Sequence, residues 1–193
     1  MSNTDTSSAL TSSALSTLTG TYAIDPAHSR IGFVARHAMV TKVRGAFNDF
    51  TGTFVLDGDN PANSTAAVTI KAASIDTRNE QRDGHIRGND FLSMDEYPEI
   101  TFVSTSARQT GDEAFELTGD LTIKGISNSI TIPFSYEGSA KDPFGNFRVG
   151  FEGAVTINRK DYGVTWNAAL ETGGVLVSDK VTLEFEISAV RNA

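Results

Sequence analysis

The sequence predicts an all-β domain in which about eight antiparallel strands close into a barrel with one short helical flap. Apolar and polar residues alternate along most of the chain, turn-forming residues separate these runs, and one segment breaks the alternation. Strands that are apolar on one side bury that side only. An open sheet would leave two unpaired edges, which closure removes. A β-sandwich is the alternative architecture.

The strands are predicted from apolar residues spaced two apart, because successive side chains of a strand point to opposite faces. In the first run, Ile31, Phe33, Ala35 and His37 share one face, opposite Arg30, Gly32, Val34 and Arg36. The spacing recurs at Val68, Ile70 and Ala72; Ile100 and Phe102; Leu117, Gly119, Leu121 and Ile123; Ile130, Ile132 and Phe134; Val149, Phe151, Gly153, Val155 and Ile157; and Val181, Leu183, Phe185 and Ile187. Each run predicts a strand with one buried face.

Glycine, proline, aspartate and asparagine gather between these runs, as is typical of turns. The predicted turns are at 57–61, 110–112, 124–128, 142–146 and 171–174. Connections this short favour antiparallel neighbours.

The segment between Thr77 and Leu92 lacks the alternation and suits one or two helical turns. Arg78 and Arg82 lie four residues apart, and Tyr97-Pro98 returns the chain to an extended path. A helix around Asp83 to Phe91 favours a barrel with a covered end over a sandwich.

Composition limits the classes of function. The chain of 193 residues suits one domain. Its net charge of -8 makes nucleic acid an unexpected partner. Because cysteine is absent, disulfides, thiolate metal sites and cysteine nucleophiles are excluded.

The N-terminal segment is rich in serine and threonine. Residues 1–20 hold few apolar side chains and are expected to form a disordered tail, which leaves residues 21–193 as the folded domain. The tail does not read as a signal peptide, and no run is apolar enough for a membrane span. A cytoplasmic protein is expected.

Several motifs are spread over the chain from about Thr21 to Val190. They are Tyr22, Asp25, His28-Ser29 and Phe33; Gly45-x-Phe47; 74–77; 82–86 followed by Asp90-Phe91 and 97–102; 119–125; 158–163; and 177–179. In these motifs the chain resembles the YceI-like family of polyisoprenoid-binding, lipocalin-like barrels. It departs from the family where Leu92 replaces a frequent phenylalanine and Lys124 a common histidine.

The resemblance implies an eight-stranded barrel whose lumen holds a polyisoprenoid or similar lipid chain. It implies a binding or transport protein that is not an enzyme and needs no cofactor beyond a bound isoprenoid or fatty-chain lipid. The residues expected to line the lumen are Ile31, Phe33, Ala35, Phe47, Ile70, Phe91, Phe102, Leu121, Phe134, Phe151 and Phe185. The alternative is a structural or interaction barrel with a filled core, in which phenylalanines such as Phe33, Phe102, Phe134 and Phe185 pack against one another.

Catalytic and metal sites find little support in the sequence. The three histidines show no metal-ligand spacing, and no Gly-x-Ser-x-Gly motif occurs. The carboxylates Asp90, Asp95, Glu96 and Glu99 are expected to be solvated around the flap. Arg82, Asp83 and His85 are expected to be structural residues of the flap, with Asp83 and His85 bonding its backbone.

One stretch has a charge opposite to that of the whole chain. Residues 27–48 contain no acid but carry Arg30, Arg36, Lys42 and Arg44. They predict a patch that docks on anionic lipid headgroups, where each basic residue contributes about 1 kcal/mol. The alternative is an ordinary solvated strand face. The sequence leaves a monomer or a homodimer open.

Overall fold

The computed structural model describes residues 12–193, and in that range eight antiparallel strands close into the predicted barrel. Around the barrel they are β1 (Gly20–Ile24), β4 (Phe50–Leu56), β5 (Thr65–Lys71), β7 (Glu99–Gln109), β8 (Ala114–Ile123), β9 (Ile126–Lys141), β10 (Phe147–Asn158) and β11 (Lys180–Arg191). The pairing of β1 with β11 closes the ring, with Tyr22 opposite Arg191. A sandwich is therefore excluded.

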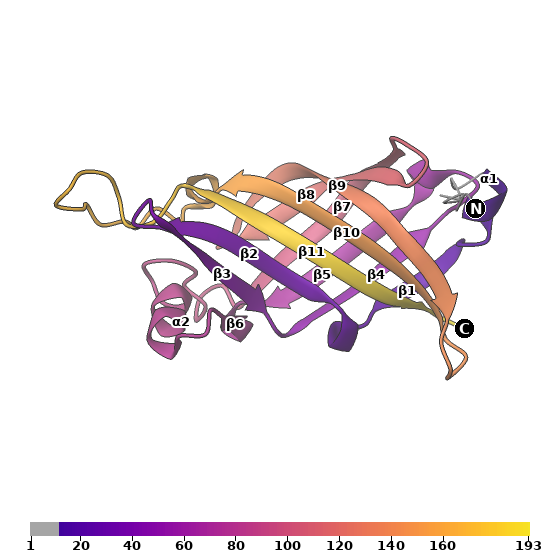
Figure 1. Ribbon diagram of the computed structural model, residues 1–193, viewed down its shortest axis with the longest axis horizontal. Helices are drawn as coiled ribbons and strands as arrows, with labels where there is room; N and C mark the ends of the chain where they lie inside the picture. The colour runs from indigo at the N-terminus through magenta and orange to yellow at the C-terminus, as the bar shows by residue number, and fades with distance from the viewer. Residues whose placement is uncertain (1–11) are drawn as a thin grey trace, which may run out of the picture.

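One long strand is shared by two short ones. The last residues of β11, 189–191, pair with β1, whereas residues 182–186 pair with β2 (Arg30–His37). Beyond β2 the sheet continues through β3 (Thr41–Phe47) to the short β6 (Ile75–Asp76). The barrel is therefore long, with α1 (Ser12–Ser16) near one end and α2 (Glu80–Arg87) at the other (Figure 1).

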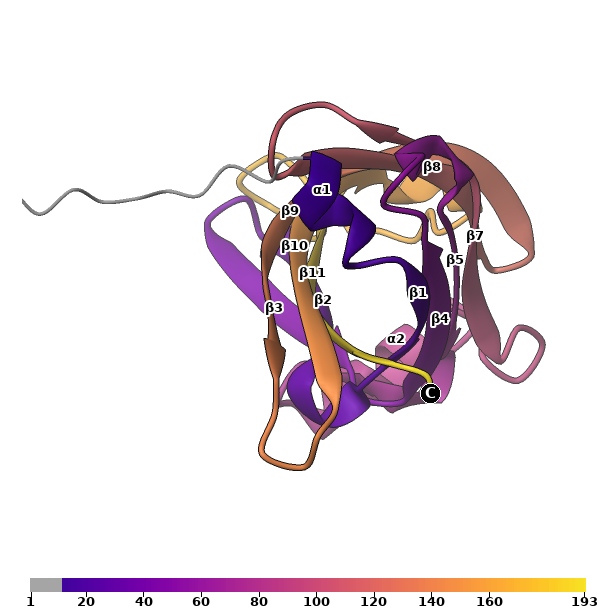
Figure 2. The ribbon, with the colours of Figure 1, turned by 90° about the vertical axis from the view of Figure 1, so that its right-hand side faces the viewer.

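Four short 3-10 helices complete the described elements: η1 (Pro26–His28), η2 (Pro61–Asn63), η3 (Ala72–Ser74) and η4 (Arg159–Tyr162). Seen from the α1 end, the strands surround the long axis and α2 lies at the far end (Figure 2). Within residues 12–193, none of the helices has the length and apolar character needed to cross a membrane.

The N-terminal prediction is wrong from Ser12 onward, because this part of the expected tail is folded. Leu15 and Leu18 are 7% and 4% exposed. The Tyr22 hydroxyl donates to the Leu18 carbonyl oxygen at 2.7 Å. The few apolar residues suffice because the barrel end supplies a surface for them to pack on. The rest of the predicted tail, residues 1–11, lies outside the described residues.

The flap contains a helix of the predicted length of one or two turns. The helix α2 covers 80–87, and the chain then turns repeatedly before β7. Asn79 begins the helix, since its side-chain oxygen accepts a hydrogen bond from the Arg82 amide at 2.9 Å.

The turn between β8 and β9 is shorter than the predicted 124–128, because residue 126 already belongs to β9. Lys124 and Gly125 have φ of 52° and 74°, which suits a two-residue hairpin.

An arginine secures the interruption between β1 and β2. Arg148 on β10 contacts the carboxylates of Asp25 at 2.7 Å and Asp142 at 2.9 Å. Asp25 also caps η1 by accepting from the Ala27 amide. The arginine therefore ties the break between the two short strands to the β9–β10 turn.

These contacts lower the pKa of both carboxyls. Hydrogen bonds from Arg148 and then His28 lower the pKa of Asp25. Partial burial raises the pKa of Asp142, but the bonds it accepts from Arg148 and Asn146 outweigh burial and lower it to about 2.

We expect acid to destabilise the fold through this cluster. Because both pKa values are lower in the folded state, the stabilisation is complete above the ordinary value of 3.8 and is lost as pH falls toward about 2. Replacing Arg148 with methionine should flatten the pH dependence of the urea midpoint in this window. The control Lys71→Met removes a cation paired with Glu99 and leaves Asp25 and Asp142 intact. An equal pH dependence in wild type and Arg148→Met would contradict the assignment.

Candidate ligand-binding site

Two cavities lie end to end inside the barrel. The first, the α1 cavity, has a volume of about 170 Å³ and lies under Leu15 and Leu18. The second, the α2 cavity, has about 570 Å³ and lies against the flap. Ile31, Ile70 and Phe185 line both cavities. The two cavities therefore adjoin at these three side chains.

The residues predicted to face the lumen all line these cavities. Phe102, Phe134 and Phe151 line the α1 cavity; Phe33, Ala35, Phe47, Phe91 and Leu121 line the α2 cavity; and Ile31, Ile70 and Phe185 line both. Whether these side chains bind a lipid chain stays a prediction. Of the phenylalanines named for a filled core, Phe134 and Phe185 contact each other at a centroid distance of 5.9 Å, while the two cavities leave space beside them.

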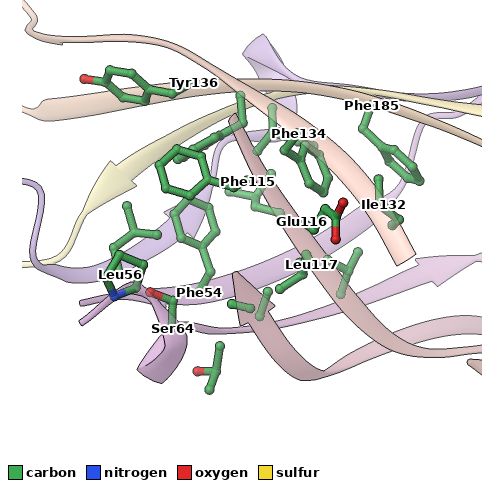
Figure 3. Close-up of a pocket in the computed structure, with 18 of the residues that line it drawn as sticks. Phe54, Leu56, Ser64, Phe115, Glu116, Leu117, Ile132, Phe134, Tyr136 and Phe185 are labelled. Atoms are coloured by element: carbon green, nitrogen blue, oxygen red, sulfur yellow. The ribbon is translucent and has the colours of Figure 1, made fainter. Parts of the chain in front are cut away.

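The α1 cavity is almost wholly apolar. Its aromatic cluster centres on Phe151, whose ring contacts those of Phe54, Phe115 and Tyr136 at centroid distances of 6.0, 6.4 and 5.7 Å. Figure 3 shows Phe54 and Phe115 turned toward each other, with oxygens from Ser64 and Glu116 among the lining groups. This chamber suits a hydrocarbon chain.

Polar side chains gather at the α2 cavity. Asn79, Gln81, Arg82 and His85 belong to its lining. The His85 ring meets Trp166 edge-on at 4.8 Å, and its Nε2 lies 2.9 Å from a carboxylate oxygen of Asp90. The two chambers therefore differ in polarity.

Two flap residues hold the backbone that leads into α2. Arg82 donates to the Thr77 hydroxyl at 2.7 Å and to the Thr77 carbonyl oxygen at 2.6 Å. Asp83, only 4% exposed, accepts from the Thr77 amide at 2.9 Å. This geometry fits a structural role. His85 differs from the prediction, because it contacts Asp90 and the cavity instead of the flap backbone.

A wall of the α2 cavity depends on Arg159, whose role the sequence analysis missed. Its guanidinium is 6% exposed and donates to the carbonyl oxygens of Ser178, Val164 and Trp166 at 2.8–2.9 Å. Burial lowers the pKa of this guanidinium, which nevertheless stays charged. It holds the segment that carries Trp166. Carbonyl partners leave no side-chain signature in a sequence, so composition could not reveal them.

The predicted basic patch is partly neutralised. Glu184 on β11 accepts from Arg30 at 3.3 Å and lies 3.6 Å from Arg44. Two of the four cations are therefore paired, because the neighbouring strand supplies an acid that residues 27–48 lack. Docking on anionic headgroups stays a prediction. Arg36 and Lys42 stand opposite each other on β2 and β3, and neither forms an ion pair within the described part of the chain.

Glycines let large rings lie flat on the barrel wall. Phe134 stands opposite Gly153, and a Cβ placed on that glycine would lie 2.6 Å from the ring. Likewise a Cβ on Gly45, opposite Phe33, would lie 2.4 Å from its ring. Only glycine admits a ring this close to the backbone. The rings therefore lie along the wall, which keeps the lumen open.

No group of three or more His, Asp or Glu side chains suited to a metal gathers among residues 12–193. The expectations of no metal and no catalysis stay predictions.

Comparison with known proteins agrees with this geometry. A family model for the YceI-like domain matches residues 22–189. A UPF0312 protein of Staphylococcus aureus is 40% identical over 169 residues, which cover 87% of this chain and 95% of the relative. A UPF0312 protein of Ectopseudomonas mendocina is 40% identical over 146 residues, 75% and 76% of the two chains.

Solved structures share the fold. BcnA of Burkholderia cenocepacia aligns with a TM-score of 0.76 at 27% identity, covering 86% of this chain and 98% of its own. The YceI protein of Campylobacter jejuni aligns at 0.71 and 30% identity, covering 82% and 90%. A polyisoprenoid binding domain from Saccharophagus degradans aligns at 0.67 over 89% and 98%, and at 14% identity it shows the fold alone.

We expect Gly45→Ala to narrow the α2 cavity. The new methyl group would force the Phe33 ring off the wall and toward the lumen, with a loss of unfolding free energy of about 1–3 kcal/mol. A crystal structure of the variant measures the ring position and the cavity volume. Gly45→Ala with Phe33→Leu should regain the space. An unmoved Phe33 ring in Gly45→Ala would refute the role given to this glycine.

We expect Arg159→Met to loosen the wall of the α2 cavity. Carbonyl oxygens left without donors should lower the free energy of unfolding by on the order of 3 kcal/mol. The emission of Trp166, the sole tryptophan, should shift to the red as its segment loosens. Lys160→Met, at the adjacent exposed residue, serves as the control. Unchanged emission and stability in Arg159→Met would show that the arginine does not hold this segment.

Proposed function

The chain belongs to the family of YceI-like domains, and from that premise we propose that its barrel binds and carries one long apolar chain, a polyisoprenoid or similar lipid. The observation that carries the proposal is the pair of adjoining cavities with shared lining at Ile31, Ile70 and Phe185. The Saccharophagus degradans domain of the same fold is described as polyisoprenoid binding, which supports this class of ligand.

Burial of the chain supplies the affinity. Each methylene contributes about 0.8 kcal/mol, so roughly ten of them offer about 8 kcal/mol, enough for micromolar binding when ordering costs are small. Those costs fall when the cavity is preformed. An open lumen lined by rings that already lie on the wall meets this condition.

The difference in polarity between the chambers orients the ligand. The α1 cavity is lined mainly by hydrocarbon, whereas the α2 cavity offers Asn79, Arg82 and His85. A chain with one polar end therefore places its apolar tail under α1 and its polar end beside α2. The role is binding without chemical conversion of the ligand.

We also propose that the β2–β3 turn brings the barrel to an anionic membrane. Met39 and Val40 at the tip are 56% and 76% exposed, and Arg36 and Lys42 flank them. Ala38 and Met39 have φ of 51° and 63°, a costly conformation for residues other than glycine. Local charge acts within a Debye length of about 8 Å, so the net charge of -8 does not prevent the contact.

Ile31→Trp should block the lumen where the cavities meet. We expect organic extraction and mass spectrometry to recover a long-chain lipid from wild type and at least tenfold less from this variant, because the larger ring fills the space where the two cavities adjoin. Ile126→Trp, at an exposed position, is the matched control. Thermal melting reports whether each variant folds. Equal lipid in folded Ile31→Trp and wild type would refute the proposed ligand path.

Reversal of an unpaired cation beside the turn should slow transfer from membranes. Lys42→Glu, which does not line either cavity, should lower the rate of lipid pickup from phosphatidylserine vesicles by roughly fivefold, since about 1 kcal/mol is lost with the cation. Pickup of lipid presented in a neutral detergent should not change. The control Arg30→Glu alters a residue already paired with Glu184. Wild-type rates that are equal for neutral and anionic vesicles at low salt would eliminate the docking surface.

A further inference from the structure

The segment formed by α1 and the turn that follows it contributes two side chains to the lumen. Leu15 and Leu18 are buried and line the α1 cavity together with Phe54 and Leu56. The helix lies at the opposite end of the barrel from α2 (Figure 1). These two leucines therefore form part of the cavity wall at the end of the barrel away from α2.

Polar contacts fasten this segment to the barrel. The Tyr22 hydroxyl donates to the Leu18 carbonyl oxygen, and the Arg191 guanidinium donates to that of Thr17 at 3.0 Å. The Thr19 hydroxyl accepts from the Gly58 amide at 3.0 Å. The segment is thus bonded to β1, to β11 and to the loop after β4.

Gly58 admits the helix at close range. A Cβ at this position would lie 1.8 Å from the Leu15 carbonyl oxygen, so any side chain would push α1 away from the barrel. The Ser16 hydroxyl also donates to the neighbouring Asp59 carboxylate. The loop after β4 is therefore shaped to receive α1 and to hold Leu15 and Leu18 against the cavity.

We propose that Leu15 and Leu18 are specificity-determining residues that set the maximum length of chain that the lumen accepts. The inference rests on the proposed function and names the part of the protein that limits its ligand. A chain that extends from the α2 cavity past Ile31, Ile70 and Phe185 ends at these leucines. Methylenes beyond that point stay outside the barrel and add no affinity.

This arrangement predicts a characteristic dependence of affinity on chain length. Burial of each further methylene should tighten binding about fourfold until the chain reaches α1. Beyond that length the dissociation constant should stop falling. A lumen open at both ends would instead let longer chains protrude at the far side, with no limit that depends on these two leucines.

The experiment measures dissociation constants for straight-chain fatty alcohols of increasing length, delivered from cyclodextrin, with Trp166 fluorescence as the readout. This tryptophan lines the α2 cavity, so the reporter lies away from the altered residues. Leu15→Ala with Leu18→Ala should move the length limit to longer chains. Leu18→Phe should move it to shorter chains, and provides an opposite test if the alanine variant folds poorly.

Val149→Ala is the control, since Val149 is 2% exposed and lines neither cavity. It should leave the length limit where it is in wild type. A limit that stays unchanged in both leucine variants overturns the inference while the proposed function stands. A wild-type protein that binds no alcohol of any length overturns both.

Discussion

Flat packing of phenylalanine rings on cross-strand glycines is the constraint on which the rest of this structure depends. Protein interiors normally fill to the density of organic crystals. Here Phe33 and Phe134 lie against Gly45 and Gly153 on the barrel wall, and space remains along the axis. In the protein without ligand, the side chains around this space lack packing contacts on that side. A bound chain would restore them, so occupancy and stability are linked.

The two ends of the barrel follow from how β11 is shared. One edge of β11 pairs with β10. Along its other edge, β1 pairs with the last residues of β11 and β2 with the earlier ones, so two strands separated by η1 form the wall there. The cavity at one end is small and apolar and is bordered by Leu15 and Leu18. The cavity at the other end is larger and is lined by polar side chains of α2. Arg148 fastens the break between the two short strands, and Arg159 fastens the wall beside the flap.

The sequence predicted the barrel and the residues that line it, because alternation records which side of a strand is buried. The sequence did not predict features that depend on contacts between residues far apart in the chain. Glu184 neutralises part of a patch that contains no acid of its own, and only strand pairing brings it there. Leu15 and Leu18 are too few to predict a folded segment from the sequence. In the structure they are buried because they pack against the end of the barrel. The strands β1, β3, β4 and β6 were not singled out, since β1 and β6 are short and β3 interleaves its apolar residues with the cations.

Closure of the ring by the first and last strands has a consequence for the order of folding. β1 pairs with β4 locally, but its other edge finds its partner in β11, near the C-terminus. During synthesis the growing sheet therefore keeps an open edge until the final strand has left the ribosome. Contacts between residues so far apart in sequence form slowly, and exposed edges in the meantime can pair with other chains. Chaperone demand should therefore be greatest just before the last strand emerges.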